Sequence, residues 1–320
     1  MDEPLRAPMA PKHAASEFRH VVSINDFSRE QLVRVLEVAS KLEHVRDDRL
    51  KGRILATLFF EPSTRTRLSL EAAMTQLGGS AIGFADAHVS SAKKGETLYD
   101  TIRVLTQYAD VIAIRHPLEG AARVAAEASS VPVINGGDGS NQHPTQTFID
   151  LFTMAKAHPG LLDGSKEFTV ALLGDLRYGR TIHSLIMALA YFRVRFRLIS
   201  PPSLRLGDEY LELLSARGIP FEQGERLDEA VSGVDILYVT RIQEERFPDP
   251  VEYMRVRNSY QVRAESLGGA KSGFIVMHPL PRVNEIDRSV DDLKVTAYFA
   301  QAGYGIPVRK AVLCLVLGRL

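Results

Sequence analysis

Residues 54–79 read ILATLFFEPSTRTRLSLEAAMTQLGG, a stretch that combines a buried strand, a short turn and a helix. The run at 54–60 is apolar except for Thr57, and a short run of this kind suits a strand that is buried on both faces. Four apolar residues follow at i, i+3, i+4 and i+7 from Leu70, and a glycine pair at 78–79 ends the pattern. The stretch therefore predicts a strand at Ile54–Phe60 and a helix at Ser63–Leu77.

The same alternation of apolar runs and helical patterns continues along the chain, with a break at Pro159-Gly160. Before the break we predict strands at Ala81–Ala85, Val111–Arg115 and Val131–Asn135, and helices at Glu96–Tyr108, Glu119–Ala128 and 143–157. After the break we predict strands at Phe168–Leu173, Phe196–Ser200, Asp235–Thr240 and Phe274–Met277, and helices at Thr181–Phe192, Asp208–Ala216 and Leu227–Ser232. Strands that alternate with helices form parallel sheets covered on both faces. The predicted fold class is α/β, with two doubly wound domains that each contain a mostly parallel sheet flanked by helices.

Length and composition limit the class of protein. The 320 residues exceed one compact core and suit two α/β domains of ordinary size. Hydrophobic residues make up 45% and charged residues 24%, a balance that excludes a chain disordered throughout. The 39 basic and 39 acidic residues give a net charge of zero, whereas chains that bind nucleic acid or anionic membranes normally carry a basic surplus. We therefore expect neither of these partners.

Cysteine and histidine usage points to a cytoplasmic protein without a metal. The single cysteine, Cys314, excludes an intramolecular disulfide and a cysteine-rich metal cage. The nine histidines show no metal-ligand spacing. No apolar run approaches the ~18 residues of a membrane-spanning helix. Residues 1–20 lack the apolar core of a signal peptide, so we expect a flexible N-terminal tail there.

In doubly wound sheets, ligands bind outside the carboxyl ends of the strands, so residues that directly follow strands are the candidate site residues. The turn after the first strand reads EPSTRTR (61–67) and opens a helix with hydroxyl groups at 63, 64 and 66. The N–H groups of the first helical turn, the positive end of the helix dipole and Arg65 together suit a phosphate. An ordinary serine N-cap with solvated arginines is the alternative. Two arginines in a first turn oppose the helix dipole unless an anion neutralises them.

Two more strand ends in the first half carry candidate residues. Arg115 ends a strand and points to the same edge, although such an arginine is also common as a surface ion-pair partner. The glycine-rich stretch NGGDGSNQHPTQ (135–146) allows close approach of backbone to a ligand and leads into a helix. His143 and Gln146 lie three residues apart on its first turn and share a face. We interpret His143 as a group that polarises a carbonyl, and a purely structural histidine is the open alternative.

The second half offers groups for a substrate with carboxylates. GDLRYGRT (174–181) joins a strand to a helix but lacks the G-x-G-x-x-G pattern, and Asp175 would repel a pyrophosphate, so we expect no NAD and no other cofactor. Arg180 and Arg241 follow strands, and each can hold a carboxylate through two hydrogen bonds. In HPLPR (278–282), two prolines bracket Leu280 and make the position of its backbone carbonyl rigid.

Seven motifs resemble those of the aspartate/ornithine carbamoyltransferase family. They are FFEPSTRTR (59–67), KKGET (93–97), RHP (115–117), HPTQ (143–146), GDLRYGRT (174–181), TRIQ (240–243) and HPLPR (278–282). The last three resemble the branch of the family whose acceptor is aspartate. The ornithine branch typically has an S-M-G loop and H-C-L-P, and this chain has neither. The match runs in order from about residue 50 to the C-terminus, and the seven motifs together are highly specific.

The resemblance implies both the activity and the domain organisation. The reaction would transfer the carbamoyl group of carbamoyl phosphate to L-aspartate, giving N-carbamoyl-L-aspartate and phosphate, the committed step of de novo pyrimidine (UMP) biosynthesis. A carbamoyl-phosphate-binding domain is expected at 21–154, completed by a C-terminal helix at about 306–320, and an aspartate-binding domain at 155–305. Thr66, Arg115 and His143 would stabilise a tetrahedral intermediate.

The resemblance also assigns residues to the two substrates. Carbamoyl phosphate would be bound by Ser63, Thr64, Arg65, Thr66, Arg115, His143, Gln146, Ser90, Lys94, Pro279 and Leu280. Aspartate would be bound by Lys94, Arg180, Arg241 and Gln243. The catalytic groups would be His143, Arg65, Thr66, Arg115 and Lys94. Ser90 and Lys94 resemble a loop that reaches into the site of a neighbouring subunit, which implies a homotrimer with shared active sites.

Several alternatives stay open at this point. A carbamoyltransferase for ornithine is disfavoured, because its cationic acceptor would face Arg241 and Gln243. A silent homologue that acts as a scaffold would have lost site residues, yet every expected position is filled. The sequence identifies no general base for the aspartate amine, and the departing phosphate could accept that proton. A regulatory chain or a dihydroorotase partner is compatible with the sequence.

Overall fold

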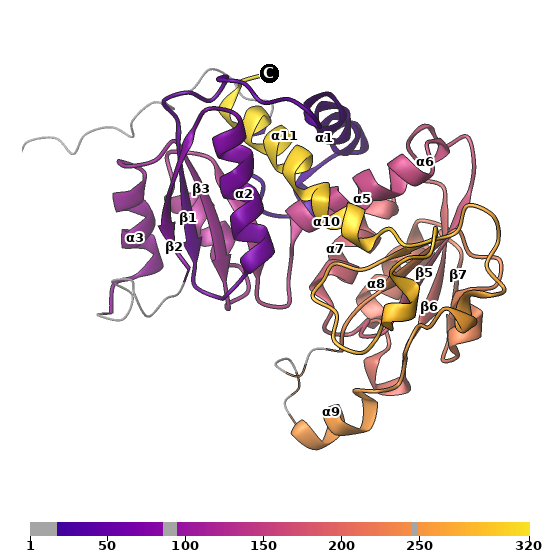
Figure 1. Cartoon of the computed structure of the whole chain (residues 1–320). Coiled ribbons are helices and arrows are strands. Elements are labelled where there is room, and N and C mark those ends of the chain that lie inside the picture. Colours follow the sequence, from indigo (N-terminus) through magenta and orange to yellow (C-terminus); the bar gives the residue numbers. More distant parts are fainter. Residues whose placement is uncertain (1–17, 86–94, 243, 245–246, 248) are drawn as a thin grey trace, which may run out of the picture.

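The chain forms two α/β lobes, which lie side by side in Figure 1. The structure is a computed structural model and describes residues 18–85, 95–242, 244, 247 and 249–320. Most of the predicted N-terminal tail, residues 1–17, lies outside the described residues. Each lobe contains one sheet in which all strands run parallel, with helices packed against it. The predicted fold class is confirmed.

The first sheet has the strand order β2-β1-β3-β4. Its strands are β1 (Ile54–Phe59), β2 (Ser80–Phe84), β3 (Val111–His116) and β4 (Val133–Asp138). The helices of this part are α1 (Arg29–Leu42), α2 (Thr64–Gln76), α3 (Leu98–Leu105) and α4 (Ala121–Ala128). Along β1, Leu55 joins the buried cluster that includes α2 side chains, whereas Ala56 joins the cluster that includes α3 and α4 side chains. Both faces are covered, which explains the unbroken apolar run of β1.

The second sheet has the strand order β7-β6-β5-β8-β9. Its strands are β5 (Phe168–Leu173), β6 (Val194–Ile199), β7 (Phe221–Gly224), β8 (Ile236–Val239) and β9 (Ile275–Met277). The helices of this part are α6 (Gly160–Asp163), α7 (Arg180–Leu189), α8 (Asp208–Ala216) and α9 (Pro250–Val256). Short 3₁₀ helices lie at η1 (Ile24–Asp26), η4 (Pro202–Leu204), η5 (Leu227–Ala230), η7 (Glu265–Leu267) and η8 (Arg288–Val290).

The chain crosses between the lobes twice. Helix α5 (Pro144–Ala157) leads from the first sheet to the second. Helices α10 (Tyr298–Gly303) and α11 (Gly305–Leu317) then return to the first lobe, where α11 packs against α1 and α2 (Figure 1). The C-terminal helix is therefore part of the first lobe, although the second lobe precedes it in the sequence.

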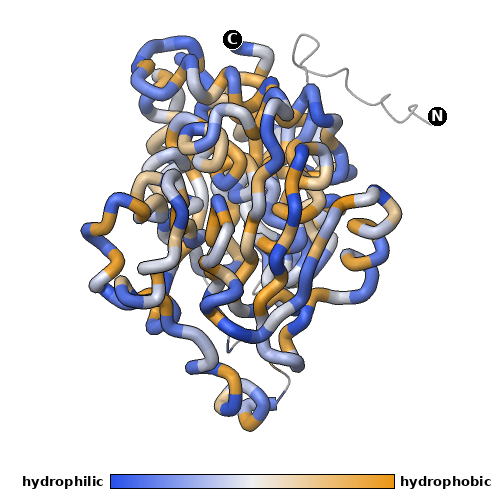
Figure 2. Tube along the Cα trace, turned by 90° about the vertical axis from the view of Figure 1, so that its right-hand side faces the viewer, coloured by the Kyte–Doolittle hydropathy of each residue, from blue (hydrophilic) through white to orange (hydrophobic). Residues whose placement is uncertain are grey.

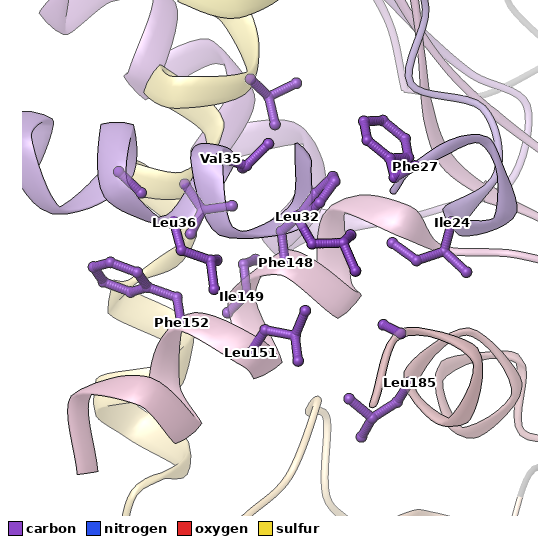
Figure 3. Packing of buried hydrophobic residues seen from close by; sticks show 14 of the residues in the cluster. Ile24, Phe27, Leu32, Val35, Leu36, Phe148, Ile149, Leu151, Phe152 and Leu185 are labelled. Carbon is purple, nitrogen blue, oxygen red and sulfur yellow. The ribbon is translucent and has the colours of Figure 1, made fainter. Parts of the chain in front are cut away.

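The largest buried cluster extends across both lobes. Figure 3 shows Leu32 and Leu36 of α1 beside the apolar side chains of α5, and Leu185 of α7 on the other side of Leu151. In Figure 2, hydrophobic stretches follow the strands and helices inside the lobes, while many turns at the outline are hydrophilic. Because α5 is packed from both sides, the start of this helix is held in a defined position between the sheets.

Helices α1, α6, α9 and α10 were not predicted from the sequence. Three further elements differ from the sequence-based predictions. The helix expected at Leu227–Ser232 is the 3₁₀ helix η5, because a turn at Gly233, with φ of +72°, leaves too few residues for a stable α-helix. Strand β7 was not expected, since this polar edge strand has no apolar run. Strand β4 continues through Asp138 into the expected turn. There the Asn135 side chain donates to the carbonyl of Val22 (2.9 Å) and to Asp138 (2.8 Å).

Across the described ranges, none of the helices has the length and apolarity needed to cross a membrane.

Candidate active site

A cleft of about 480 Å³ is lined by residues that follow strands of both sheets and by residues of α10 and α11. Eleven of the fourteen predicted site residues line it: Ser63, Thr64, Arg65, Thr66, Arg115, His143, Gln146, Arg180, Arg241, Pro279 and Leu280. The remaining three, Ser90, Lys94 and Gln243, lie outside the described residues. The carboxyl ends of strands in two separate sheets thus contribute to a single cleft, as expected for doubly wound folds.

The N-terminus of α2 opens into the cleft. Ser63 is the N-cap residue, but its side chain makes no capping hydrogen bond, and the first turn contains no acidic residue. Arg67 donates to Glu71 one turn further along (2.8 Å), so an internal partner neutralises that arginine. Arg65 lines the cleft instead, and partial burial lowers the pKa of its guanidinium. Backbone N–H groups, hydroxyls and Arg65 therefore form a site for an anion.

Glu61 lies between two arginines from different lobes. Its Oε2 is 3.3 Å from Nη2 of Arg115, near the end of β3, and 3.5 Å from Nη1 of Arg180, the first residue of α7. Arg115 also donates to the carbonyl of Gly136 (3.2 Å), and Arg180 donates to the carbonyl of Gly139 (2.6 Å). Glu61 and these carbonyls hold the two guanidinium groups at the cleft wall.

The cleft is strongly electropositive. Five of the described residues that line it are arginines, namely Arg65, Arg115, Arg180, Arg241 and Arg309. Among the described residues that line the cleft, Glu61 is the single acidic residue. Arg309 comes from α11 and is 3% exposed, and burial lowers its pKa to about 10. A surplus of fixed cations in a partly enclosed site favours a substrate that carries several negative charges.

His143 is the N-cap residue of α5 and is buried. Its backbone N–H donates to the Ser184 hydroxyl (3.2 Å), and its Nδ1 lies 3.4 Å from the hydroxyl oxygen of Thr145. Burial, followed by the positive charges of Arg180, Arg115 and Arg309, holds the pKa of His143 well below its usual value. The imidazole is therefore neutral at physiological pH and can donate one hydrogen bond without bringing a charge.

The loop after β9 lines the cleft with His278, Pro279, Leu280 and Pro281. His278 Nδ1 accepts a hydrogen bond from the backbone N–H of Leu280 (2.8 Å), so the ring proton is on Nε2, which lies 2.8 Å from Glu285 Oε1. Leu280 has a φ of +53°, a left-handed conformation that costs a leucine about 1–2 kcal/mol. The histidine and its glutamate hold this costly conformation in place, which gives Pro279 and Leu280 defined positions.

Two charged residues that line the cleft, Glu61 and Arg309, were not among the predicted site residues. Glu61 stands in the quoted turn, and its signal was an acid placed directly after a buried strand among basic residues. In the sequence, the whole second lobe lies between Arg309 and the other first-lobe residues that line the cleft. A charged residue at the start of the apolar run of α11 was its only local signal. Within the described ranges, no three His, Cys, Asp or Glu side chains gather in a way that could hold a metal ion.

Two family models match the chain. The model described as "Aspartate/ornithine carbamoyltransferase, carbamoyl-P binding domain" matches residues 19–156. The model described as "Aspartate/ornithine carbamoyltransferase, Asp/Orn binding domain" matches residues 166–316. The first match contains the first sheet, and the second contains the second sheet together with α10 and nearly all of α11.

Curated relatives match over nearly their whole length. The chain is 55% identical to the aspartate carbamoyltransferase catalytic subunit of Thermococcus kodakarensis over 307 residues, covering 94% of this chain and 98% of that protein. It is 52% identical to the catalytic subunit of Methanocaldococcus jannaschii over 301 residues, covering 92% and 96% of the two chains.

Solved structures agree with this similarity. The catalytic subunit of M. jannaschii aspartate transcarbamoylase superposes with a TM-score of 0.86 at 50% identity and covers 94% of this chain and 98% of its own. Trypanosoma cruzi aspartate transcarbamoylase in complex with carbamoyl phosphate and aspartate gives a TM-score of 0.87 at 37% identity, with coverage of 93% and 97%.

Proposed function

The chain belongs to the aspartate/ornithine carbamoyltransferase family, and on this premise we propose how its cleft carries out the aspartate carbamoyltransferase reaction. The enzyme transfers the carbamoyl group of carbamoyl phosphate to aspartate, a step of the pyrimidine pathway. The observation that carries the proposal is the meeting of a helix N-terminus, five arginines and a neutral histidine in one cleft. One substrate brings a phosphate and the other brings two carboxylates, and such a pair needs several fixed cations.

The phosphate of carbamoyl phosphate binds at the start of α2. Ser63, Thr64 and Thr66 offer hydroxyl and backbone N–H donors there, and Arg65 and Arg115 add positive charge. The open N-cap of Ser63 supports this assignment, since its hydroxyl is not used within the helix. Donors that are positioned before the ligand arrives lose little entropy when it binds.

The carbonyl oxygen of the same substrate is bound by Thr66, Arg115 and His143. When the amino group of aspartate attacks the carbonyl carbon, this oxygen gains negative charge, and donors placed around it stabilise the tetrahedral intermediate. The neutral state of His143 supports the role, because an imidazole that donates one hydrogen bond can strengthen that bond as charge develops. Gln146 and the carbonyl oxygens of Pro279 and Leu280 orient the carbamoyl NH₂.

Aspartate binds on the side of the second lobe. Arg180 and Arg241 hold its two carboxylates, and Gln243 and Lys94, outside the described residues, are proposed to assist. The C–N bond forms, the bond between the carbonyl carbon and the phosphate oxygen breaks, and the phosphate leaves with the electron pair. The departing phosphate accepts the proton of the attacking amine, so no side chain has to act as a general base.

Shared active sites complete the proposal. Ser90 and Lys94, which lie outside the described residues, are proposed to reach into the site of a neighbouring subunit, which would make a homotrimer the smallest active assembly. The predicted division into residues 21–154 with about 306–320, and residues 155–305, is also proposed as the division into substrate domains. The packing of α11 on α1 and α2 supports it. A cytoplasmic location and a regulatory or dihydroorotase partner stay predictions.

The test is product formation by the purified chain with carbamoyl phosphate, comparing L-aspartate and L-ornithine in parallel. We expect N-carbamoyl-L-aspartate and phosphate in equal amounts, and no citrulline. If the chain used ornithine but not aspartate as the acceptor, the proposed binding of carbamoyl phosphate would stand. The proposed roles of Arg180 and Arg241 would be refuted. The absence of turnover with both acceptors would refute the proposal for the isolated chain.

A further inference from the structure

A buried carboxyl group lies directly behind the cleft. Asp150 sits on α5, two turns after His143, and is completely inaccessible to solvent. Its Oδ1 accepts hydrogen bonds from the amide nitrogens of Gln146 (2.7 Å) and Gln301 (2.7 Å). Its Oδ2 accepts one from the hydroxyl of Tyr238 (2.8 Å). The three partners come from α5, α10 and β8, so one side chain joins elements of both lobes.

These contacts determine the direction of the Gln146 amide. An unprotonated carboxyl oxygen can only accept, so the NH₂ of Gln146 has to face Asp150. The carbonyl oxygen of the same amide is then directed away from Asp150, and Gln146 lines the cleft. The carbonyl oxygen of Gln146 can then accept a hydrogen bond from an NH₂ group of a ligand. If the amide were flipped, its own NH₂ would face the ligand's NH₂, and two donors would meet.

The second glutamine transmits the same constraint to the loop after β9. Gln301 donates its NH₂ to Asp150, and its carbonyl oxygen accepts the backbone N–H of His278 (2.9 Å). A backbone N–H can only donate, so both ends of the Gln301 amide are determined. His278 in turn accepts a hydrogen bond from the backbone N–H of Leu280. Asp150 is thus connected to both groups that face the carbamoyl NH₂ in the proposed function.

We infer that Asp150 is a positioning residue that orients Gln146 and the 278–280 loop as acceptors for the NH₂ of carbamoyl phosphate. This inference rests on the proposed function for the identity of the ligand. The positioning role of Asp150 would explain why this cleft distinguishes an NH₂ group from a methyl group of similar size. Burial raises the pKa of Asp150 to about 7. A proton on Oδ2 would leave Oδ1 able to accept from both amides, so the arrangement survives protonation.

The test compares carbamoyl phosphate with acetyl phosphate, which carries CH₃ in place of NH₂. Dissociation constants of both ligands and of inorganic phosphate are measured for the unaltered chain and for Asp150→Leu, Asp150→Asn and Asp235→Leu. Asp235 is a matched control, because it is a buried carboxyl that precedes β8 at the far end of the sheet. Asp150→Leu and Asp235→Leu both replace a buried carboxyl group with the same apolar side chain, so the steric change is similar.

We expect the unaltered chain to prefer carbamoyl phosphate over acetyl phosphate by at least tenfold. Asp150→Leu should lower this preference about tenfold and leave the affinity for inorganic phosphate within about twofold. Asp150→Asn keeps an oxygen that can face both glutamines, so it should retain the preference within about threefold. Asp235→Leu should leave the preference unchanged.

An unchanged preference in Asp150→Leu would overturn the inference. So would an equal loss of affinity for all three ligands, since that is the effect of general structural damage. If Asp150→Leu does not fold, Gln301→Met tests the second arm alone, and it should lower the preference about threefold. No change in that variant would overturn the inference as well.

Binding and turnover separate this inference from the proposed function. A chain that prefers carbamoyl phosphate but transfers its carbamoyl group to neither acceptor refutes the proposed reaction and leaves the role of Asp150 supported. A chain that forms N-carbamoyl-L-aspartate but binds both acyl phosphates equally refutes the role of Asp150.

Discussion

His143 is kept neutral by its surroundings. The side chain is buried beside three arginines, and each of these factors lowers the pKa of the imidazole. A protonated histidine would add a further positive charge to an electropositive cleft and would also lose the acceptor at Nδ1 that faces Thr145. The position therefore selects a hydrogen-bond donor and excludes a general acid, which suits a group that binds a carbonyl oxygen.

Replacing His143 with alanine should reduce turnover far more than substrate affinity. We expect kcat to fall about 10²- to 10³-fold, because the lost hydrogen bond strengthens only as the intermediate forms. The dissociation constant of carbamoyl phosphate should change only a few-fold. Steady-state kinetics together with direct binding measurements check this. His143→Gln, which keeps an N–H donor, should recover part of the activity. Equal losses in kcat and affinity would mean that His143 only binds.

Asp150 makes stability depend on pH. Its pKa is about 7 in the folded chain against a usual value of 3.8, because burial disfavours the charge. Between these values the folded chain holds a proton that the unfolded chain releases, so the free energy of unfolding falls as the pH rises. Below about pH 4 both states carry the proton, and above about pH 7 the loss is complete.

Asp150→Asn removes this titration, and so its stability relative to the unaltered chain should rise with pH. We expect the difference in free energy of unfolding to grow by up to about 1.4 kcal/mol per pH unit between pH 5 and pH 7. Urea denaturation of both chains at several pH values measures it, with Asp235→Asn as the control. A difference that is the same at every pH would show that Asp150 does not titrate in this range.

Glu61 and Arg309 show what residue-level reasoning misses. Ten of the eleven predicted residues that line the cleft follow a strand or lie at the start of a helix, and Arg115 lies one residue before the end of β3. The sequence reveals positions of this kind. Arg309 lies in the second turn of α11, inside an apolar pattern that is typical of a core helix. Its place at the cleft depends on how α11 packs against α1, α2 and α5, and no local pattern encodes that contact.

Helix α1 shows how local chemistry defines an element. Ser28 caps its N-terminus by accepting the backbone N–H of Gln31 (3.3 Å), and the Gln31 side chain accepts the N–H of Ser28 (2.8 Å). Buried residues such as Leu32, Val35 and Leu36 lie on one face and pack toward α5 and α11. A reciprocal cap and an apolar face together are sufficient to start this helix at one residue.

Ser28→Ala should destabilise the fold without affecting the site. We expect the free energy of unfolding to fall by about 1 kcal/mol, since one N–H of the first turn loses its partner. Ser28→Asp keeps an oxygen acceptor at the cap and should remain within a few tenths of a kcal/mol of the unaltered chain. Denaturation curves measure both, and kcat should be unchanged. A larger loss of stability in the aspartate variant would contradict the capping role.

Several elements with strong periodicity were predicted with their bounds, although the capped, amphipathic helix α1 was not predicted. Strand β5 and helix α8 have the predicted bounds, because both carry a complete apolar pattern between turn residues. Strand β7 pairs only with β6 at the sheet edge, and its side chains are half exposed. Such a strand forms because its neighbour offers free backbone groups, so its sequence needs no hydrophobic pattern.

The whole molecule is two lobes that share one core. The largest cluster runs from α1 and α11 through α5 to α7, so neither lobe can be removed without exposing apolar surface of the other. The cleft takes the start of α2 and Arg115 from the first lobe, and Arg180, Arg241 and the 278–281 loop from the second. Both substrates can therefore be held only when the two lobes keep their relative position.

Shared sites in a trimer predict that two inactive chains can complement each other. Arg65→Ala lacks the arginine proposed to bind the phosphate, and Lys94→Ala lacks the lysine proposed to reach the neighbouring subunit. When the two are mixed under conditions of subunit exchange, about a quarter of the sites should combine an intact cleft with an intact lysine. Assays of the mixture should show activity that neither variant has alone. No recovery despite verified exchange would contradict shared sites.

The α/β class, eight of the nine strands and most residues that follow them can be predicted from the amino-acid sequence. Periodicity, caps and glycines act over a few residues, so the printed chain contains these signals in full. Contacts between distant segments depend on how elements pack, and here packing brings Arg309 to the cleft, sets Glu61 between Arg115 and Arg180, and brings Gln301 to Asp150. These contacts join segments that lie far apart in the sequence. Their physical basis is the burial that forces charged and polar groups from separate lobes to pair with each other.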